Sequence, residues 1–218
     1  MRFLVRGFGV ELVIENIRSD DALQRARAET FLLENPDPGV RLRPKDELDR
    51  AIDTGQGLLV SDRSDICGIS LVYQYDPGAP GHVDYEIGTM RVVAQGHGLQ
   101  AFLAWFHLVQ ITLEDDASRG DIFAVVTPDT ASAHNMTAHV RMVDWTPSDT
   151  LVLMRRAAGV PFSEKKMVLL ADQAAISSAF LKLRALRLDD NRFRAPKGDA
   201  VIMIQMGWFS ADLLNHVG

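Results

Sequence analysis

The sequence predicts an α+β fold built on one mixed, mostly antiparallel sheet with flanking helices. The first observation is a run of three strand-like segments, at 57–62, 66–75 and 82–92, separated only by short turns. Short turns join antiparallel neighbours, so this run predicts a meander. The second observation is a strand, a glycine-containing loop, a long apolar helix and another strand, an order that predicts a parallel crossover.

One strand and two helices are expected before the meander. Residues 3–14 are rich in Val, Leu, Ile and Phe and predict a strand. The Ser-Asp-Asp run at 19–21 provides N-capping side chains for a helix over about 20–34. Pro44 and the acidic residues behind it favour a second helix, which Gly55 ends.

The segment after the meander contains the longest predicted helix, at about 98–115, where apolar residues recur at helical spacing. A basic and polar connector is expected at 189–199, and a short helix is expected at the end of the chain. The other expected elements are a strand at 121–127, a helix at about 130–142, a strand at 150–155, a helix at 171–187 and a strand at 200–206.

Composition excludes several classes of protein. A chain of 218 residues is long enough to bury a core, and its net charge of −6 opposes general nucleic-acid binding. No apolar run is long enough to span a bilayer. Cys67 is the single cysteine, which excludes a disulfide framework and favours a cytoplasmic location. No metal site is expected, because His134 and His139 are five residues apart and do not share an α-helical face.

The most informative segment is 84–100, in which a strand, two glycines and a helix start follow one another. Gly96 and Gly98 leave backbone free of side chains where a ligand has to approach closely. The free N–H groups and the positive dipole end of the following helix form an anion site, of which phosphate is the usual occupant. No Gly-Lys-Ser/Thr follows, so the loop is not a P-loop.

Residues 95–100 (QGHGLQ) resemble the Gln/Arg-x-x-Gly-x-Gly/Ala motif of the GNAT superfamily of N-acetyltransferases, which use acetyl-CoA; Gln100 departs from its last position. The order of elements over roughly 8–156 is also similar to that family. The resemblance implies a splayed strand pair at the CoA site, a GNAT-like domain at 1–156, and an α/β extension at 157–218 that packs on the core or forms a dimer contact. It assigns the cofactor contacts to Met90, Arg91, Val92, Gln95, Gly96, His97, Gly98, Leu99, Gln100 and Asn135. Of these, the His97 side chain is expected to face solvent.

The same resemblance implies direct attack of an amine on the acetyl thioester in a ternary complex, with backbone N–H groups polarising the carbonyl. Glu86, on the strand before the loop, is the expected base. Strand alternation places Asp84 on the same face, and we expect the two carboxylates to raise each other's pKa. The family's usual acid is a tyrosine, but Val140 occupies that position here. His134 or His139 are possible substitutes.

Other interpretations stay open at this point. The missing tyrosine also fits a non-catalytic acyl-CoA-binding or regulatory domain. A structural or assembly protein, in which the glycine loop is only a turn, is a third possibility. For an enzyme, the expected partners are acetyl-CoA and a small-molecule or peptide amine, without nucleic acid or membrane. The apolar strand at 200–206 could extend a sheet edge in a homodimer.

Overall fold

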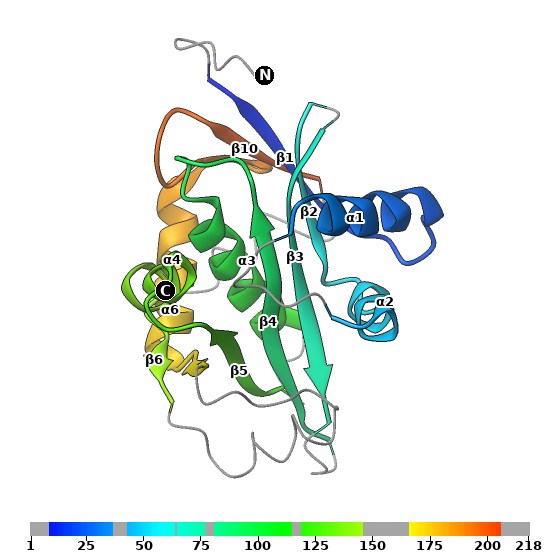
Figure 1. The fold of residues 1–218 in the computed structure, drawn as a ribbon. Helices are drawn as coiled ribbons and strands as arrows, with labels where there is room; N and C mark the ends of the chain where they lie inside the picture. The colour runs from blue at the N-terminus through cyan, green and yellow to red at the C-terminus, as the bar shows by residue number, and fades with distance from the viewer. Residues whose placement is uncertain are drawn as a thin grey trace.

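The computed structural model describes residues 9–36, 43–63, 65–76, 81–114, 119–145 and 166–205. Ten strands of these residues form one sheet in the order β6-β7-β5-β4-β3-β2-β1-β10-β9-β8 (Figure 1). The β1–β10 and β4–β5 pairs are parallel and the others antiparallel, which confirms the predicted mixed sheet. The strands are β1 (Glu11–Asn16), β2 (Leu58–Asp62), β3 (Asp65–Tyr75), β4 (Val83–Val92), β5 (Arg119–Val126), β6 (Val143–Asp144), β7 (Met167–Leu170), β8 (Arg187–Asp189), β9 (Arg192–Arg194) and β10 (Val201–Gln205).

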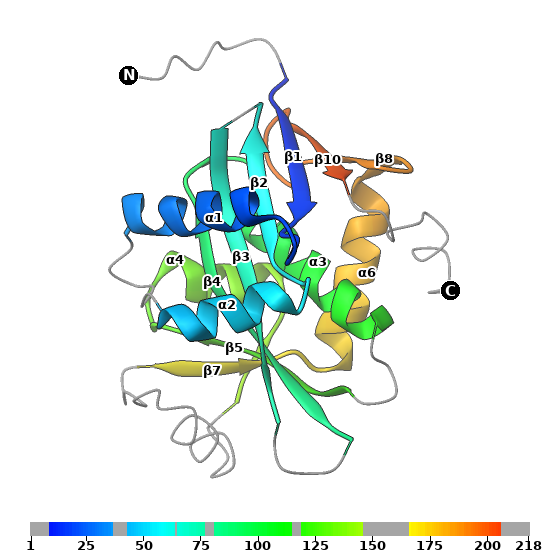
Figure 2. The ribbon, with the colours of Figure 1, turned by 90° about the vertical axis from the view of Figure 1, so that its right-hand side faces the viewer.

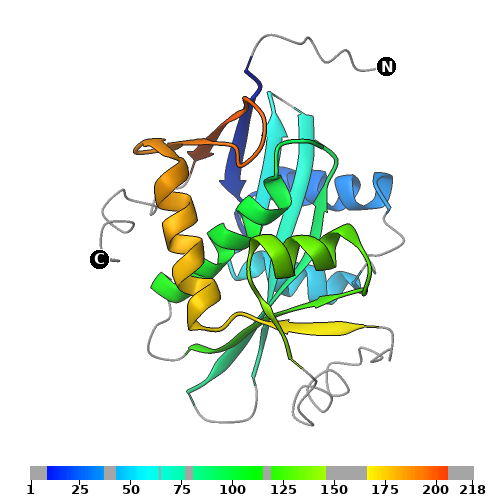
Figure 3. The ribbon, with the colours of Figure 1, turned by 90° about the vertical axis from the view of Figure 1, so that its left-hand side faces the viewer.

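Helices cover both faces of the sheet. In Figure 2 α1 and α2 lie in front of the strands, and in Figure 3 the opposite face is covered by α3, α4 and α6. Asp21 caps α1 by accepting a hydrogen bond from the backbone N–H of Gln24, as the Ser-Asp-Asp run predicts. The helices are α1 (Ala22–Glu34), α2 (Lys45–Asp53), α3 (Leu99–Glu114), α4 (Ala131–His134), the π-helical turn η1 (Asn135–His139) and α6 (Gln173–Leu186).

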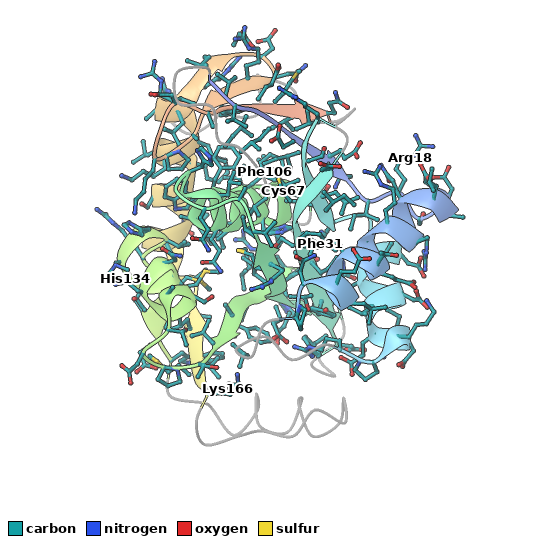
Figure 4. The ribbon with its side chains drawn as sticks, turned by 45° about the horizontal axis from the view of Figure 1, so that its top comes forward. Arg18, Phe31, Cys67, Phe106, His134 and Lys166 are labelled. Carbon is teal, nitrogen blue, oxygen red and sulfur yellow. The ribbon has the colours of Figure 1, made fainter. Side chains whose placement is uncertain are left out.

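Each face of the sheet has its own apolar cluster. Phe31 of α1 packs on one face with residues of α2 and β3. On the other face, Cys67 and Phe106 belong to a larger cluster around α3, as Figure 4 shows. Cys67 is buried, as expected for a small apolar side chain. None of the described helices combines the length and the apolar character needed to cross a membrane.

The core around α3 also contains polar side chains. His107, Ser70 and Gln110 are completely buried. The Nε2 of His107 lies 2.8 Å from the Ser70 hydroxyl oxygen, while its Nδ1 is buried without a partner among the described residues. Burial lowers the pKa of His107 from 6.5 to about 3, so the ring is neutral in the folded protein.

The C-terminal segments extend the sheet on both sides. β7 pairs with β5, and β10 lies between β1 and β9. Both edges of β10 are paired within the chain, so this strand has no free edge for the sheet extension that we expected in a homodimer. The predicted connector at 189–199 is partly wrong, since β8 and β9 form an antiparallel hairpin there. Their three-residue lengths are too short for a strand pattern to show.

Two further expectations differ from the structure. The first strand, predicted at 3–14, is β1 at Glu11–Asn16 and so ends two residues later than expected; residues 3–8 of the predicted segment lie outside the described ranges. The helix expected at 130–142 is a short α4 that continues as a π-turn. The predicted strand at 150–155, the domain boundary at 156 and the predicted last helix lie outside the described residues.

The π-turn also overturns the expectation for the two histidines. The N–H of Val140 donates to the carbonyl of Asn135, a spacing of five residues instead of four. At that spacing residues five apart share a face, and the rings of His134 and His139 meet edge to face with centroids 5.5 Å apart. His134 is exposed on the outside of α4 (Figure 4). No group of three metal-ligating side chains occurs within the described ranges.

Candidate active site

The glycine loop joins the end of β4 to the start of α3. Gly96 and Gly98 both have positive φ, of 87° and 71°, which explains why the loop needs glycine at these positions. The carbonyl of Gly98 accepts the first helical hydrogen bond, from the N–H of Phe102. Because the N–H groups before that residue have no partner within the helix, the loop presents donors to an anion. Gln95 and Gly96 are exposed, whereas the Leu99 side chain is buried in the core.

Strands β4 and β5 separate directly before this loop. Their pairing runs from Val83 to Glu86 of β4, and the structure records no β5 partner for 87–92. A bulge against β3 occurs at Thr89, whose φ is +44° and whose hydroxyl lies 2.5 Å from that of Tyr73. This arrangement is the splayed pair that the sequence resemblance implies, and it leaves one backbone edge of β4 unpaired among the described residues.

The candidate cofactor residues on β4 have different surroundings. Met90 is buried in the core beside α3. Arg91 is half-buried, and its Nη2 donates to the carbonyl of Pro36 after α1. Val92 packs against the edge of the core and pairs with Gly68 of β3. Only their backbone can therefore line the gap between β4 and β5.

The absence of a side chain at Gly98 makes room for another loop of the same protein. A Cβ at Gly98 would lie 2.9 Å from the Cβ of Pro196, which belongs to the loop between β9 and β10. The backbone N–H of Lys197 in the same loop donates to the carbonyl of His97. We expected Gly98 to permit a ligand's approach; the structure shows that it also permits the approach of this loop.

The His97 side chain is not simply exposed to solvent, contrary to the sequence expectation. It is half-buried, and its Nδ1 is buried without a partner among the described residues. A Cβ at Gly198 would lie 3.2 Å from that nitrogen. The ring therefore lies under the β9–β10 loop, because Gly198 leaves the space for it.

Gln100 and Asn135, both expected to contact CoA, bond to each other. The Asn135 amide donates to Oε1 of Gln100 at 2.5 Å, and the Gln100 amide donates to the hydroxyl of Ser132 at 2.9 Å. These bonds join the first turn of α3 to α4 and to the start of the π-turn. Both side chains are half-buried. Through these bonds they hold the start of α3 in position.

Glu86 lies at the centre of a buried polar cluster on the α1 and α2 face. It is 2% exposed, and its Oε1 accepts a 2.7 Å hydrogen bond from Nη2 of Arg43. Its Oε2 accepts a bond of the same length from the hydroxyl of Tyr75. Arg43 also donates to Glu47 at 3.2 Å, and its guanidinium lies 4.6 Å from the centre of the Tyr73 ring. One cation is thus surrounded by two carboxylates and two aromatic rings.

The charges of this cluster are fixed by its contacts. Burial on its own would lower the pKa of Arg43, but the charge of Glu86 and the neighbouring tyrosines raise it, so the guanidinium stays charged. Burial raises the pKa values of Tyr73 and Tyr75, so both hydroxyls stay protonated at neutral pH. A carboxylate has about four acceptor positions, so the two donors leave Glu86 with acceptor capacity for a further donor.

Asp84 has a different environment from the one expected. It is buried, and its Oδ1 accepts a 2.7 Å hydrogen bond from the backbone N–H of Asp121, where the β4–β5 register shifts. The pKa of Asp84 is raised, chiefly by burial. The negative charge of the neighbouring Asp121 raises it further. The expectation that Glu86 raises the pKa of Asp84 is therefore wrong, because Asp84 faces the β5 backbone.

Sequence reasoning missed Arg43 and the two tyrosines. The two tyrosines could have been predicted from the sequence, because Tyr73 lies opposite Glu86 and Tyr75 lies opposite Asp84 in the predicted hairpin. Arg43 had no local signal, since its contact with Glu86 joins segments 43 residues apart. Val140, at the expected tyrosine position, is fully buried in the core and provides no proton donor there.

Many solved structures match this chain, and two of them have a TM-score of 0.52 and 14% identity. One is Naa50 of Arabidopsis thaliana in complex with the bisubstrate analogue CoA-Ac-MVNAL, with 74% of this chain and 97% of that chain covered. The other is a chain of the NatC complex bound to Gag peptide and CoA, with 73% and 96% covered. No protein-family model and no curated protein matches the sequence. The shared element order, the splayed strands and these matches show that the chain has the fold of the GNAT superfamily.

Proposed function

We propose that the chain is an acetyl-CoA-dependent N-acetyltransferase in which an amine attacks the acetyl thioester directly within a ternary complex. The observation that carries this proposal is the separation of β4 from β5 immediately before a glycine loop and the start of α3. Among the described residues, an unpaired strand edge with its alternating N–H and C=O groups then leads directly to the free N–H groups of a helix start, in one continuous run of backbone polar groups. Such a run suits a ligand with an amide-containing arm and a phosphate group.

The residues present fit this co-substrate. The N–H groups of 95–100 would hold the pyrophosphate, and the backbone of 90–92 would pair with the pantetheine arm. Acetyl-CoA supplies the acetyl thioester, and a β4 N–H at the splay polarises its carbonyl. The two structural neighbours support this assignment, since both are described with CoA or a CoA analogue bound.

Glu86 is the proposed acceptor of the amine proton, directly or through a water molecule. An aliphatic ammonium has a pKa near 10.4, so the amine has to lose a proton before it can attack. Arg43 and Tyr75 hold the carboxylate in one orientation, and a remaining acceptor position would receive the proton donor.

The charge of the cluster also suits an amine substrate. Arg43 faces both Glu86 and Glu47, so this buried group carries one more negative than positive charge. A cationic amine beside Glu86 would balance that charge. The acceptor is therefore proposed to be a primary amine of a small molecule or peptide. A cytoplasmic location and a homodimer stay predictions.

The first experiment is calorimetric titration with acetyl-CoA and with CoA, using wild type and two variants of Gly96. A Cβ at Gly96 would meet no atom within 4 Å, and Asn and Asp tolerate positive φ better than other residues. Gly96→Asp and Gly96→Asn therefore share backbone strain and differ in charge. We expect micromolar binding by wild type and binding at least about tenfold weaker in Gly96→Asp than in Gly96→Asn. Equal affinities in the two variants would contradict the phosphate-loop assignment.

The role of Glu86 is tested by Glu86→Gln, with Glu47→Gln as the matched control. Both variants remove a carboxylate that bonds to Arg43, but only the first removes the proposed base. We expect Glu86→Gln to lower kcat at neutral pH and to leave the Kd for CoA unchanged, while Glu47→Gln keeps most of its kcat. An unchanged rate of Glu86→Gln between about pH 6 and pH 9 would remove Glu86 from this role.

A second candidate function is a non-catalytic acyl-CoA-binding or regulatory domain. The buried Val140 at the expected acid position and the closed Arg43–Glu86 pair favour it. Tight CoA binding without turnover on a broad panel of amines would support this alternative. Absence of CoA binding would leave the assembly-protein interpretation, in which Gly98 serves only the packing of Pro196.

A further inference from the structure

We propose that the loop between β9 and β10 forms one wall of the CoA phosphate site and that Lys197 contributes its ammonium group to the bound phosphates. This inference rests on the proposed function, because it assigns an additional residue to the same site. The loop belongs to the C-terminal segment rather than to the strand–loop–helix unit. It therefore adds a side chain that the motif at 95–100 does not contain.

The position of this loop is fixed by its flanks. The N–H of Ala195 donates to the carbonyl of Ala200 at 2.9 Å and closes the loop, and both alanines are buried. Phe193, just before the loop, is fully buried and meets the Phe102 ring of α3 edge to face at 5.7 Å between centroids. The helix that begins at the glycine loop is therefore packed against the strand that leads into the Lys197 loop.

The two loops also contact each other directly. The Lys197 N–H donates to the His97 carbonyl at 3.1 Å, and Pro196 fills the space beside Gly98. On the other side, Gly198 has a φ of +74° and lies over the His97 ring. Three successive residues of one loop thus contact the residues that precede the first turn of α3.

The side chain of Lys197 begins at the start of α3. Its Cγ lies 3.6 Å from the position of a Gly98 Cβ, and Cδ, Cε and Nζ lie beyond it. The residue is exposed, so the ammonium can turn toward an anion seated on the loop. Beside it, Nδ1 of His97 is a buried nitrogen with no partner among the described residues. A ligand oxygen reached through the gap between the loops, or a water that it holds, would satisfy that atom.

Charge gives a reason for a lysine at this place. The chain carries a net charge of −6, which repels an anionic ligand such as CoA. The helix start supplies only partial positive charge. Residues 182–197 contain six Lys or Arg and two Asp, and Lys197 is the member of this group that contacts the glycine loop. A full positive charge at the loop offsets the repulsion where the phosphates bind.

The test compares Lys197→Ala with Lys182→Ala by titration with CoA at low salt. Lys182 is an exposed residue of α6, so its replacement removes the same charge from the same part of the chain. Alanine at 197 keeps the backbone N–H that bonds to His97, so folding should be preserved, and a thermal melt checks this. We expect Lys197→Ala to raise the Kd for CoA about fivefold or more and Lys182→Ala to change it less than about twofold.

Three further measurements make the test specific. The Lys197→Ala effect should shrink at about 0.5 M salt because exposed charges are screened. Lys197→Arg should retain most of the affinity, and binding of pantetheine, which has no phosphate, should not change in Lys197→Ala. If wild type binds CoA but Lys197→Ala behaves as Lys182→Ala does, this inference is overturned and the proposed function stands. If wild type does not bind CoA, both are overturned.

Discussion

The buried histidine of α3 makes a prediction about acid sensitivity. His107 is neutral in the folded protein, with a pKa lowered from 6.5 to about 3 by burial. The unfolded chain binds a proton at this residue below about pH 6.5, whereas the folded chain does not. The stability associated with the neutral ring is therefore complete above the ordinary pKa and is lost as the pH falls. His107→Gln removes this titration and keeps a polar group beside Ser70.

The size of the effect follows from the two pKa values. Between about pH 7.5 and about pH 5, the proton bound only by the unfolded chain lowers the free energy of unfolding by about 2 kcal/mol. His107→Gln should lose about 2 kcal/mol less over the same interval. Every other titrating group is common to both proteins and cancels in the difference. At neutral pH the variant is expected to be less stable, because Gln does not fill the space of the ring.

Urea unfolding followed by circular dichroism at several pH values measures these free energies. His134→Gln, at an exposed position of α4, is the control for loss of a histidine. Parallel curves of stability against pH for wild type and His107→Gln would refute the reasoning. They would mean that the ring is hydrated or charged in the folded protein and that its burial does not control its titration.

The Glu86 cluster and the glycine loop give three further predictions. Arg43→Met leaves Glu86 buried without a counter-charge and should lower the free energy of unfolding by about 3–5 kcal/mol; the double variant with Glu86→Gln should recover part of this loss in urea unfolding. Tyr75→Phe removes one donor to Glu86 and should cost about 1–2 kcal/mol in the same assay. Gly98→Ala adds a Cβ at positive φ against Pro196 and should cost about 1–3 kcal/mol. Combining it with Pro196→Gly should reduce that cost, and an equal cost in the double variant would show that backbone strain alone causes it.

Local patterns were sufficient for the parts of the fold that depend on neighbours in sequence. The meander, the glycine loop and α3 were predictable because turns and apolar spacing determine them within a few residues. The positive φ of Gly96 and Gly98 adds a second reason for glycine in the loop, besides the close approach of a ligand that the sequence analysis expected. The same local reasoning placed Asp84 and Glu86 on one face of β4; the regular register with β3 agrees, but the Asp84 carboxylate turns to the β5 backbone.

Features that depend on distant contacts were not predictable. The pairing of β10 with β1 joins the two ends of the described chain, and no local pattern specifies such a partner. The β8–β9 hairpin is too short for a strand pattern. The π-turn changes the spacing at which residues share a face, and its residue types do not reveal it. At the site, the contacts of Glu86 depend on which distant side chains cover it. Arg43 is one of these, and its place depends on the position of α2.

The parallel pairing of β1 with β10 has a consequence for how the chain matures during synthesis. β1 leaves the ribosome well before its second neighbour β10 and before the loop that contacts Gly98. Contacts between the ends of a chain form late, because the intervening segments have to be ordered first. A nascent chain that has not yet reached β10 would therefore have a glycine loop without its wall, and ligand binding would begin only after the β9–β10 loop is made.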